Sequence, residues 1–256
     1  MTCPGVFGAR IESAKSNNGH PPLGTGDSFL INLQRHIFAI ADSPEWNPGA
    51  SREFLAAFNH MIEALYEQEA EIRDGTLTPD RLRDLLVTRT AEMVKGVDYR
   101  SSTTFTCLLV IPQVNLLQGL LLHAGDSCLF KMDVGEGTIS QISWTNMNFV
   151  GRSNNLAQIE WIRIDENTRF VLCTDGAQAL SRSRNHGGLQ EILLEAFREA
   201  DISQVPDLII DTYGGDIRFP DDIGLVVFNP NRLPKSDRVF ICGGEDISVE
   251  SMIQDR

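Results

Sequence analysis

The sequence lacks any hydrophobic run long enough to cross a membrane. None of its 256 residues belongs to an apolar stretch of about 20, the length that a membrane span requires. The first residues, MTCPGVFGARIES, lack the apolar core of a secretory signal peptide. We therefore expect a cytoplasmic protein with no membrane partner.

Basic residues are also scarce. The chain has 22 Lys and Arg against 35 Asp and Glu, a formal net charge of −13. This balance argues against a nucleic-acid partner, which usually requires a basic surface. It would also repel an anionic substrate, unless a cation in the site reverses the local field.

Several common site motifs are missing. The five cysteines form no C-x-x-C pair, and their odd number does not indicate a complete disulfide framework. The absence of G-x-x-x-x-G-K-[ST] and of G-x-S-x-G argues against a P-loop and against a serine nucleophile elbow. The histidines are scattered and show no metal-binding spacing.

What is present is a clustered order of strands and helices. Two short apolar runs at 29–33 and 37–41 predict a hairpin, and apolar residues at helical spacing predict helices at 51–72 and 78–96. The strand-like segments that follow are 103–113, 115–127, 127–133, 138–144, 159–165 and 169–175. Two further helices, at 189–200 and 205–215, and a strand at 222–230 complete the pattern.

Because the strands cluster instead of alternating with helices, the order predicts an α+β fold with two antiparallel sheets and helices outside them. The length suits one large domain, which we place at residues 1–230. We interpret residues 231–256 as a C-terminal appendage with one apolar patch at 239–242.

Aspartates recur at the predicted strand ends. Asp42, Asp126 and Asp175 each follow an apolar run, while Asp27 and Asp221 each precede one. A turn-forming role would explain any one of them. Converging carboxylates, however, repel one another unless a cation neutralises them, and oxygen-only ligands favour Mg²⁺ or Mn²⁺. We therefore predict a carboxylate-lined metal site at one end of the sheets, suited to polarising phosphoryl oxygens.

The order of these motifs resembles that of the metal-dependent serine/threonine protein phosphatases of type 2C, the PPM class, across roughly residues 8–229. KSNN with GDSFLI resembles the opening R-x-N-N-E-D of the family, and IFAIADSP resembles its strand ending in D-G-x-G-G. SSTTFTCLLV resembles its G-T-T strand, and LLLHAGDSCLF its V-G-D-S-R strand pair. RFVLCTDGAQAL and DDIGLVVF resemble L-L-C-S-D-G-L and the closing D-[DN]-x-[ST] strand.

The resemblance implies a divergent bacterial-type member with a four-layer α-β-β-α sandwich, two antiparallel sheets flanked by helix pairs. It implies two Mn²⁺ or Mg²⁺ ions. Asp42 would bridge them, the carbonyl of Ser43 would join the first, and Asp175 and Asp221 would hold the second. Asp27 would act through metal-bound water.

Further roles follow from the same resemblance. Asp126 matches the residue that, with Asp175, holds a third and weaker ion in bacterial members, and Lys15 stands where the family binds the substrate phosphate. The implied reaction is attack of a metal-bridging hydroxide on a phosphoserine or phosphothreonine ester of a protein substrate, with Asp42, Asp175 and Asp221 as the catalytic residues. We expect a monomer.

The chain also departs from the family pattern. Asp42 is followed by Ser43-Pro44 instead of glycine, Gly26 replaces a glutamate, and Gly224 replaces a serine or threonine. These departures motivate an alternative, a pseudophosphatase that acts as a regulatory or binding module. A third reading is a plain α+β scaffold whose aspartates only form turns. Substrate choice is expected to depend on segments 19–26 and 145–156.

Overall fold

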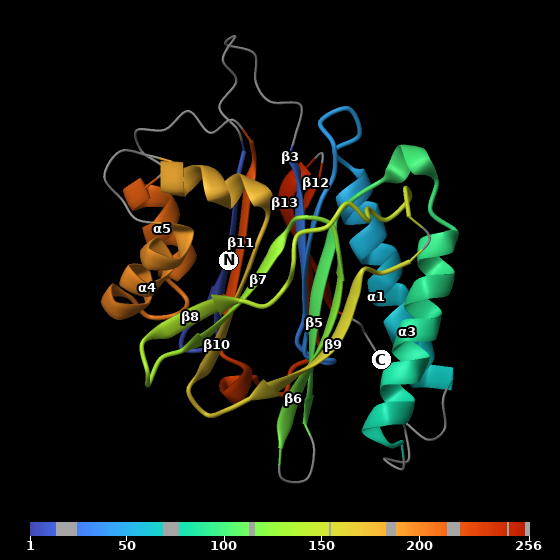
Figure 1. The fold of residues 1–256 in the computed structure, drawn as a ribbon. Helices are drawn as coiled ribbons and strands as arrows, with labels where there is room; N and C mark the ends of the chain where they lie inside the picture. The colour runs from blue at the N-terminus through green and yellow to red at the C-terminus, as the bar shows by residue number, and fades with distance from the viewer. Residues whose placement is uncertain are drawn as a thin grey trace.

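The computed structural model describes residues 1–13, 25–68, 77–112, 116–153, 155–182, 188–213, 221–244 and 246–253. These residues form four layers, in which two β-sheets face each other and a pair of helices covers the outer face of each sheet (Figure 1). This arrangement confirms the predicted α-β-β-α sandwich.

Every strand pair in the two sheets is antiparallel. Sheet A contains, in spatial order, β1 (Thr2–Cys3), β2 (Phe7–Glu12), β11 (Ile223–Phe228), β10 (Thr168–Cys173), β7 (Cys128–Asp133) and β8 (Thr138–Gln141). Sheet B contains, in spatial order, β13 (Asp246–Ile253), β12 (Arg238–Gly244), β3 (Thr25–Asn32), β4 (Ile37–Asp42), β5 (Phe105–Pro112), β6 (Leu117–Ala124) and β9 (Gln158–Ile164).

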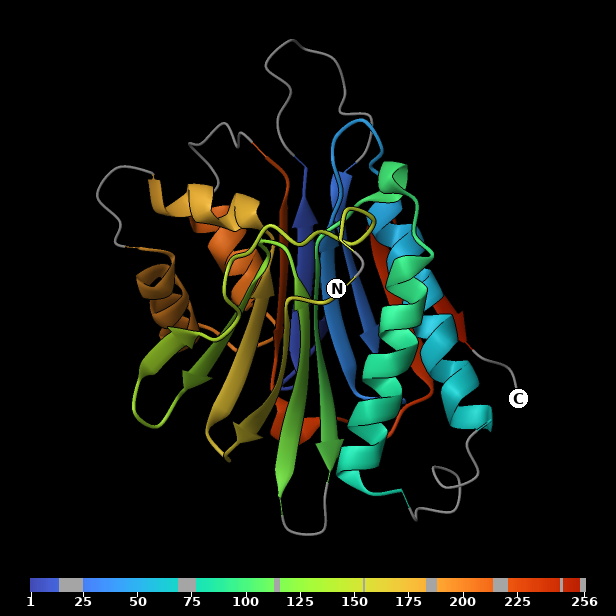
Figure 2. The same ribbon diagram turned by 45° about the vertical axis from the view of Figure 1, so that its right-hand side comes forward.

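The helices lie where the sequence periodicity predicts them. Helices α1 (Ala50–Gln68) and α3 (Pro79–Lys95) run side by side along sheet B (Figure 2), and α4 (Leu189–Glu199) and α5 (Val205–Tyr213) cover sheet A. Thr78 caps α3 as predicted, because its Oγ1 accepts the Arg81 N–H at 3.3 Å. No helix in the described part of the chain is both long and apolar enough to cross a membrane.

The principal core lies between the two sheets, where aromatic side chains from both meet. The rings of Phe38 on β4 and Phe228 on β11 stack with centroids 3.8 Å apart. Separate apolar clusters fill the space between each sheet and its helices. Because the central strands are covered on both faces, all eight residues of β3 are buried, and its sequence shows no alternation.

Two parts of the sheets have no counterpart among the predicted strands. β2, near the N-terminus, pairs with β11 in register Gly8↔Val227. In the predicted appendage, β12 pairs with β3, and Val239 and Ile241 are buried in the core beside α1. Residues 238–244 are therefore part of sheet B.

The strand registers bring the predicted aspartates to one end of the sandwich. Asp27 at the start of β3 lies opposite Asp42 at the end of β4. In the other sheet, Cys173 at the end of β10 lies opposite both Cys128 and Leu225. The residues that precede β7 and β11 and those that follow β10 therefore lie at the same end of sheet A.

Candidate functional site

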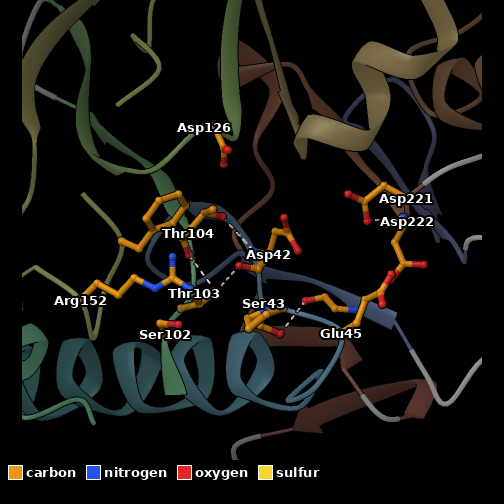
Figure 3. A pocket seen from close by; sticks show the side chains of 13 residues that line it. Asp42, Ser43, Glu45, Ser102, Thr103, Thr104, Asp126, Arg152, Asp221 and Asp222 are labelled. Carbon is orange, nitrogen blue, oxygen red and sulfur yellow. Dashed lines mark hydrogen bonds between the residues drawn. The ribbon is translucent and has the colours of Figure 1, made fainter. Parts of the chain in front are cut away.

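A pocket of about 230 Å³ opens at this shared end of the two sheets. Three of the predicted aspartates, Asp42, Asp126 and Asp221, line it together, and Ser43 lies beside them (Figure 3). Asp27 and Asp175 lie close enough for their charges to act on Asp42. The structure thus brings together six of the seven predicted site residues, while Lys15 lies outside the described residues.

Asp42 is held in place through its backbone. Its N–H donates to Thr104 Oγ1 at 2.9 Å, and its carbonyl accepts from Thr103 Oγ1 at 2.8 Å and from Thr104 N at 2.8 Å. Burial raises the pKa of the Asp42 carboxyl well above its ordinary value, and neighbouring carboxylates, Asp27 first, raise it further. Asp42 is therefore a carboxylate that the fold positions at an electrostatic cost.

Asp27 is only 1% exposed and depends on a hydroxyl from the other sheet. Thr174 Oγ1 donates to Asp27 Oδ2 at 2.7 Å and accepts from Gly224 N at 2.8 Å. Burial raises the pKa of Asp27 well above its ordinary value. The Thr174 hydrogen bond opposes that rise, and the charge of Asp222 adds to it. The unusual Gly224 is thus part of the support for Asp27.

The remaining carboxylates repel one another across the pocket. Burial raises the pKa of Asp126, Asp175 and Asp221, and in each case another of these three adds a further rise through its charge. Asp175 follows β10 and opens the 3₁₀ helix η2 (Asp175–Arg182). A cation in the pocket would relieve this repulsion.

Two glycines allow the chain to come close at this end of the sheets. A Cβ on Gly26 would lie 2.2 Å from the Ser43 carbonyl oxygen, and a Cβ on Gly176 would lie 1.8 Å from the Asp222 carbonyl oxygen. Gly26 N also donates to Asp222 Oδ2 at 2.7 Å. Gly26 therefore lets β3 approach the Ser43 carbonyl.

Ser43, which stands where the phosphatase pattern that the sequence resembles has a glycine, takes a fixed position. Its N–H donates to the Gly26 carbonyl at 3.0 Å, and its hydroxyl lies 3.1 Å from that carbonyl and 3.0 Å from that of Pro48. The segment 42–45 consequently forms one wall of the pocket.

The donor chemistry of the pocket fits a hard divalent cation. All candidate ligands are oxygen atoms, and several carboxylates share a small partly buried volume. Within the described ranges, no three His, Cys, Asp or Glu side chains already stand in a ligand arrangement around one point. The site therefore matches such an ion in donor type and charge, with the carboxylates distributed around the walls.

Sequence reasoning did not identify several residues that shape the site. Thr103, Thr104 and Thr174 support the aspartates, and Glu45 and Arg152 line the pocket. Thr103 and Thr104 lie within the SSTTFTCLLV motif, and Arg152 lies in the segment 145–156 that we linked to substrate choice. Nothing local to Thr174 indicated its bond to Asp27, 147 residues away.

Comparison with known proteins identifies the fold. No protein-family profile and no curated protein matches the sequence. Among solved structures, the catalytic domain of the serine/threonine protein phosphatase PstP, in complex with two manganese ions, is 18% identical with a TM-score of 0.59, over 86% of this chain and 96% of that one.

Two other solved structures agree with PstP. The PPM Ser-Thr phosphatase MsPP from Mycobacterium smegmatis is 16% identical with a TM-score of 0.58, over 87% of this chain and 97% of that one. PppA, a key regulatory component of T6SS in Pseudomonas aeruginosa, is 16% identical with a TM-score of 0.60, over 87% and 96%. At these identities the likeness concerns the fold, and this chain has the fold of the PPM-type serine/threonine phosphatases.

Proposed function

We propose that this protein is a metal-dependent phosphatase that hydrolyses phosphoserine and phosphothreonine esters on protein substrates. The observation that carries the proposal is the pocket in which Asp42, Asp126 and Asp221 meet, with Asp175 near enough to raise the pKa of Asp42. The fold shared with PPM phosphatases supports the same reaction class, and PstP is a neighbour that contains two manganese ions.

The residues proposed to hold two Mn²⁺ or Mg²⁺ ions are those of the pocket and its immediate surroundings. Asp42 would contact both ions, the Ser43 carbonyl one of them, and Asp175 and Asp221 the other, with Asp126 and Asp175 available to a third and weaker ion. When bound, such ions supply Lewis-acid activation of water and of the phosphoryl oxygens.

The rest of the chemistry depends on how this chain fixes its own groups. Thr103 and Thr104 hold the backbone of Asp42 through three hydrogen bonds, so that its carboxylate projects into the pocket (Figure 3). Thr174 stabilises the charged form of Asp27, whose other carboxylate oxygen would orient water. Such preorganisation lowers the reorganisation needed in the transition state.

The test is hydrolysis of p-nitrophenyl phosphate and of a phosphothreonine peptide, with and without Mn²⁺. We expect metal-dependent turnover in the wild type and a loss of two or more orders of magnitude in Asp175→Asn. Asp84→Asn is the matched control, because Asp84 is exposed on α3 and does not line the pocket. No metal-dependent turnover by a folded wild type would exclude the proposal.

A second candidate function is a regulatory module with weak or no catalysis. It is favoured by the absence of a ready ligand arrangement in the described ranges and by the change to Ser43-Pro44 after the bridging aspartate. Titration calorimetry with Mn²⁺ separates the two candidates. Two or more binding sites support the enzyme, and none supports the module.

A further inference from the structure

Arg152 is the one cationic side chain among the described residues that line the pocket. The other charged lining residues are the carboxylates Asp42, Glu45, Asp126, Asp221 and Asp222. Figure 3 shows the Arg152 guanidinium extending from its loop toward Thr103, on the opposite side of the pocket from Asp221 and Asp222. Among the described residues, Arg152 is therefore the positive side chain that a dianionic ligand would meet in this acidic pocket.

The loop that carries Arg152 is fastened to the strand segment that supports Asp42. Val150 N donates to Thr103 O at 2.9 Å, and Thr103 N donates to Val150 O at 3.1 Å. Thr103 Oγ1 in turn donates to the Asp42 carbonyl at 2.8 Å. Hydrogen bonds through Thr103 thus connect the loop of Arg152 to Asp42, the aspartate that we place at the centre of the reaction.

The turn itself is tight and specific. Arg152 N donates to the Phe149 carbonyl at 3.0 Å, which closes the turn. Gly151 has a φ of +87°, and a Cβ there would lie 2.7 Å from the Asp98 carbonyl oxygen. Glycine is required by both the left-handed conformation and the close approach, so the backbone of Arg152 is held against segment 98–103.

The guanidinium group is placed by aromatic rings. Its carbon lies 5.3 Å from the centroid of the Phe149 ring and 5.6 Å from that of Tyr99. A cation–π contact uses no N–H donor, so these contacts do not consume the hydrogen-bonding capacity of the guanidinium. In the described part of the chain, the ion pairs involve other cations, and none joins Arg152 to a carboxylate.

We propose that Arg152 binds the phosphoryl oxygens of the substrate and orients the phosphate against Asp42 and its neighbours. This inference rests on the proposed phosphatase function and adds a phosphate-binding residue to it. A planar guanidinium matches two phosphoryl oxygens with paired hydrogen bonds, whereas an ammonium offers only a point charge.

The first measurement compares three variants on two substrates. Arg152→Gln should raise KM about 10- to 100-fold, the usual effect of losing hydrogen bonds to a charged group, for both p-nitrophenyl phosphate and a phosphothreonine peptide. The KM values of Arg152→Lys should lie between those of the wild type and those of Arg152→Gln, because lysine keeps the positive charge but lacks the paired N–H donors of a guanidinium. Arg100→Gln is the matched control, since its side chain is exposed nearby but does not line the pocket, and both KM values should stay unchanged.

The two substrates decide which group Arg152 contacts. The aryl phosphate offers only a phosphoryl group and a ring, so an increase in KM for both substrates supports phosphoryl binding. An increase for the peptide alone would assign Arg152 to a flanking side chain and overturn the proposal. If Arg100→Gln raises KM as much as Arg152→Gln does, the effect comes from the loss of any nearby positive charge, and this outcome would also overturn the proposal.

A binding measurement separates this proposal from the failure of the proposed function. Calorimetric titration of inorganic phosphate in the presence of Mg²⁺ should give an affinity that is about 10- to 100-fold weaker in Arg152→Gln than in the wild type. If the wild type shows no turnover, the phosphatase proposal fails while this comparison still stands. Equal affinities in the two proteins, or no phosphate binding by the wild type, would refute the role of Arg152.

Discussion

Substituting Thr174 by valine tests whether one hydroxyl holds the two sheets together at the site. Thr174 is fully buried, donates to Asp27 Oδ2 at 2.7 Å and accepts from Gly224 N at 2.8 Å. Valine has nearly the same shape, so Thr174→Val removes both hydrogen bonds without opening a cavity. The change leaves a buried carboxyl and a buried N–H without this partner.

The magnitude follows from these two unsatisfied groups. Each costs about 1–3 kcal/mol, so for the two groups together we expect a loss of about 2–6 kcal/mol. That is a large fraction of the roughly 5–15 kcal/mol by which a typical domain is stable. Urea unfolding of the metal-free protein, followed by circular dichroism, measures the difference in free energy of unfolding.

Two further variants make the measurement specific. Thr174→Ser keeps the hydroxyl and should lose only about 1 kcal/mol through its missing methyl group. In an Asp27→Asn background, Thr174→Val should cost less than in the wild type, because the two side chains are coupled. A Thr174→Val protein as stable as Thr174→Ser, or equal costs in both backgrounds, would refute the reasoning.

Three other perturbations probe the carboxylates, the close backbone approach and the C-terminal strands. A carboxyl whose pKa is raised in the folded state is destabilising once ionised, so the stabilising contribution is present at low pH and is lost as pH rises through the folded-state pKa. The metal-free wild type should therefore have a larger free energy of unfolding at pH 5 than at pH 8. In Asp42→Asn, the difference in free energy of unfolding between the two pH values should be smaller. If this difference is the same in both proteins, the result contradicts a raised pKa of Asp42. Gly176→Ala places a methyl group within 1.8 Å of the Asp222 carbonyl oxygen and should lower the free energy of unfolding by about 1–3 kcal/mol or more, measured by thermal unfolding. An unchanged melting temperature would show that the backbone moves freely there. Removing residues 236–256 deletes β12, uncovers the edge of β3 and should lower the unfolding midpoint in urea, while an unchanged midpoint would support a separate appendage.

The sequence by itself predicted most of the helices and strands and the positions of the aspartates at strand ends. Helical spacing of apolar residues and the Thr78 cap predict α1 and α3, and alternating or continuous apolar runs predict β3 to β7, β10 and β11. Strand-end aspartates in a fixed order also predicted that Asp42, Asp126 and Asp221 converge. These features depend on residues close together in the chain, which is why periodicity and turn chemistry reveal them.

Tertiary structure alone decided how distant segments complete the site. β2 pairs with a strand more than 200 residues later, and β12 joins β3 across a similar separation. Thr174 reaches Asp27 only because the fold brings the two sheets together, and Arg152 reaches the pocket only because the bridge between Val150 and Thr103 holds its loop there. A hydroxyl or a guanidinium has no periodic signature of its own, so its role depends on which buried or charged groups the completed fold places beside it.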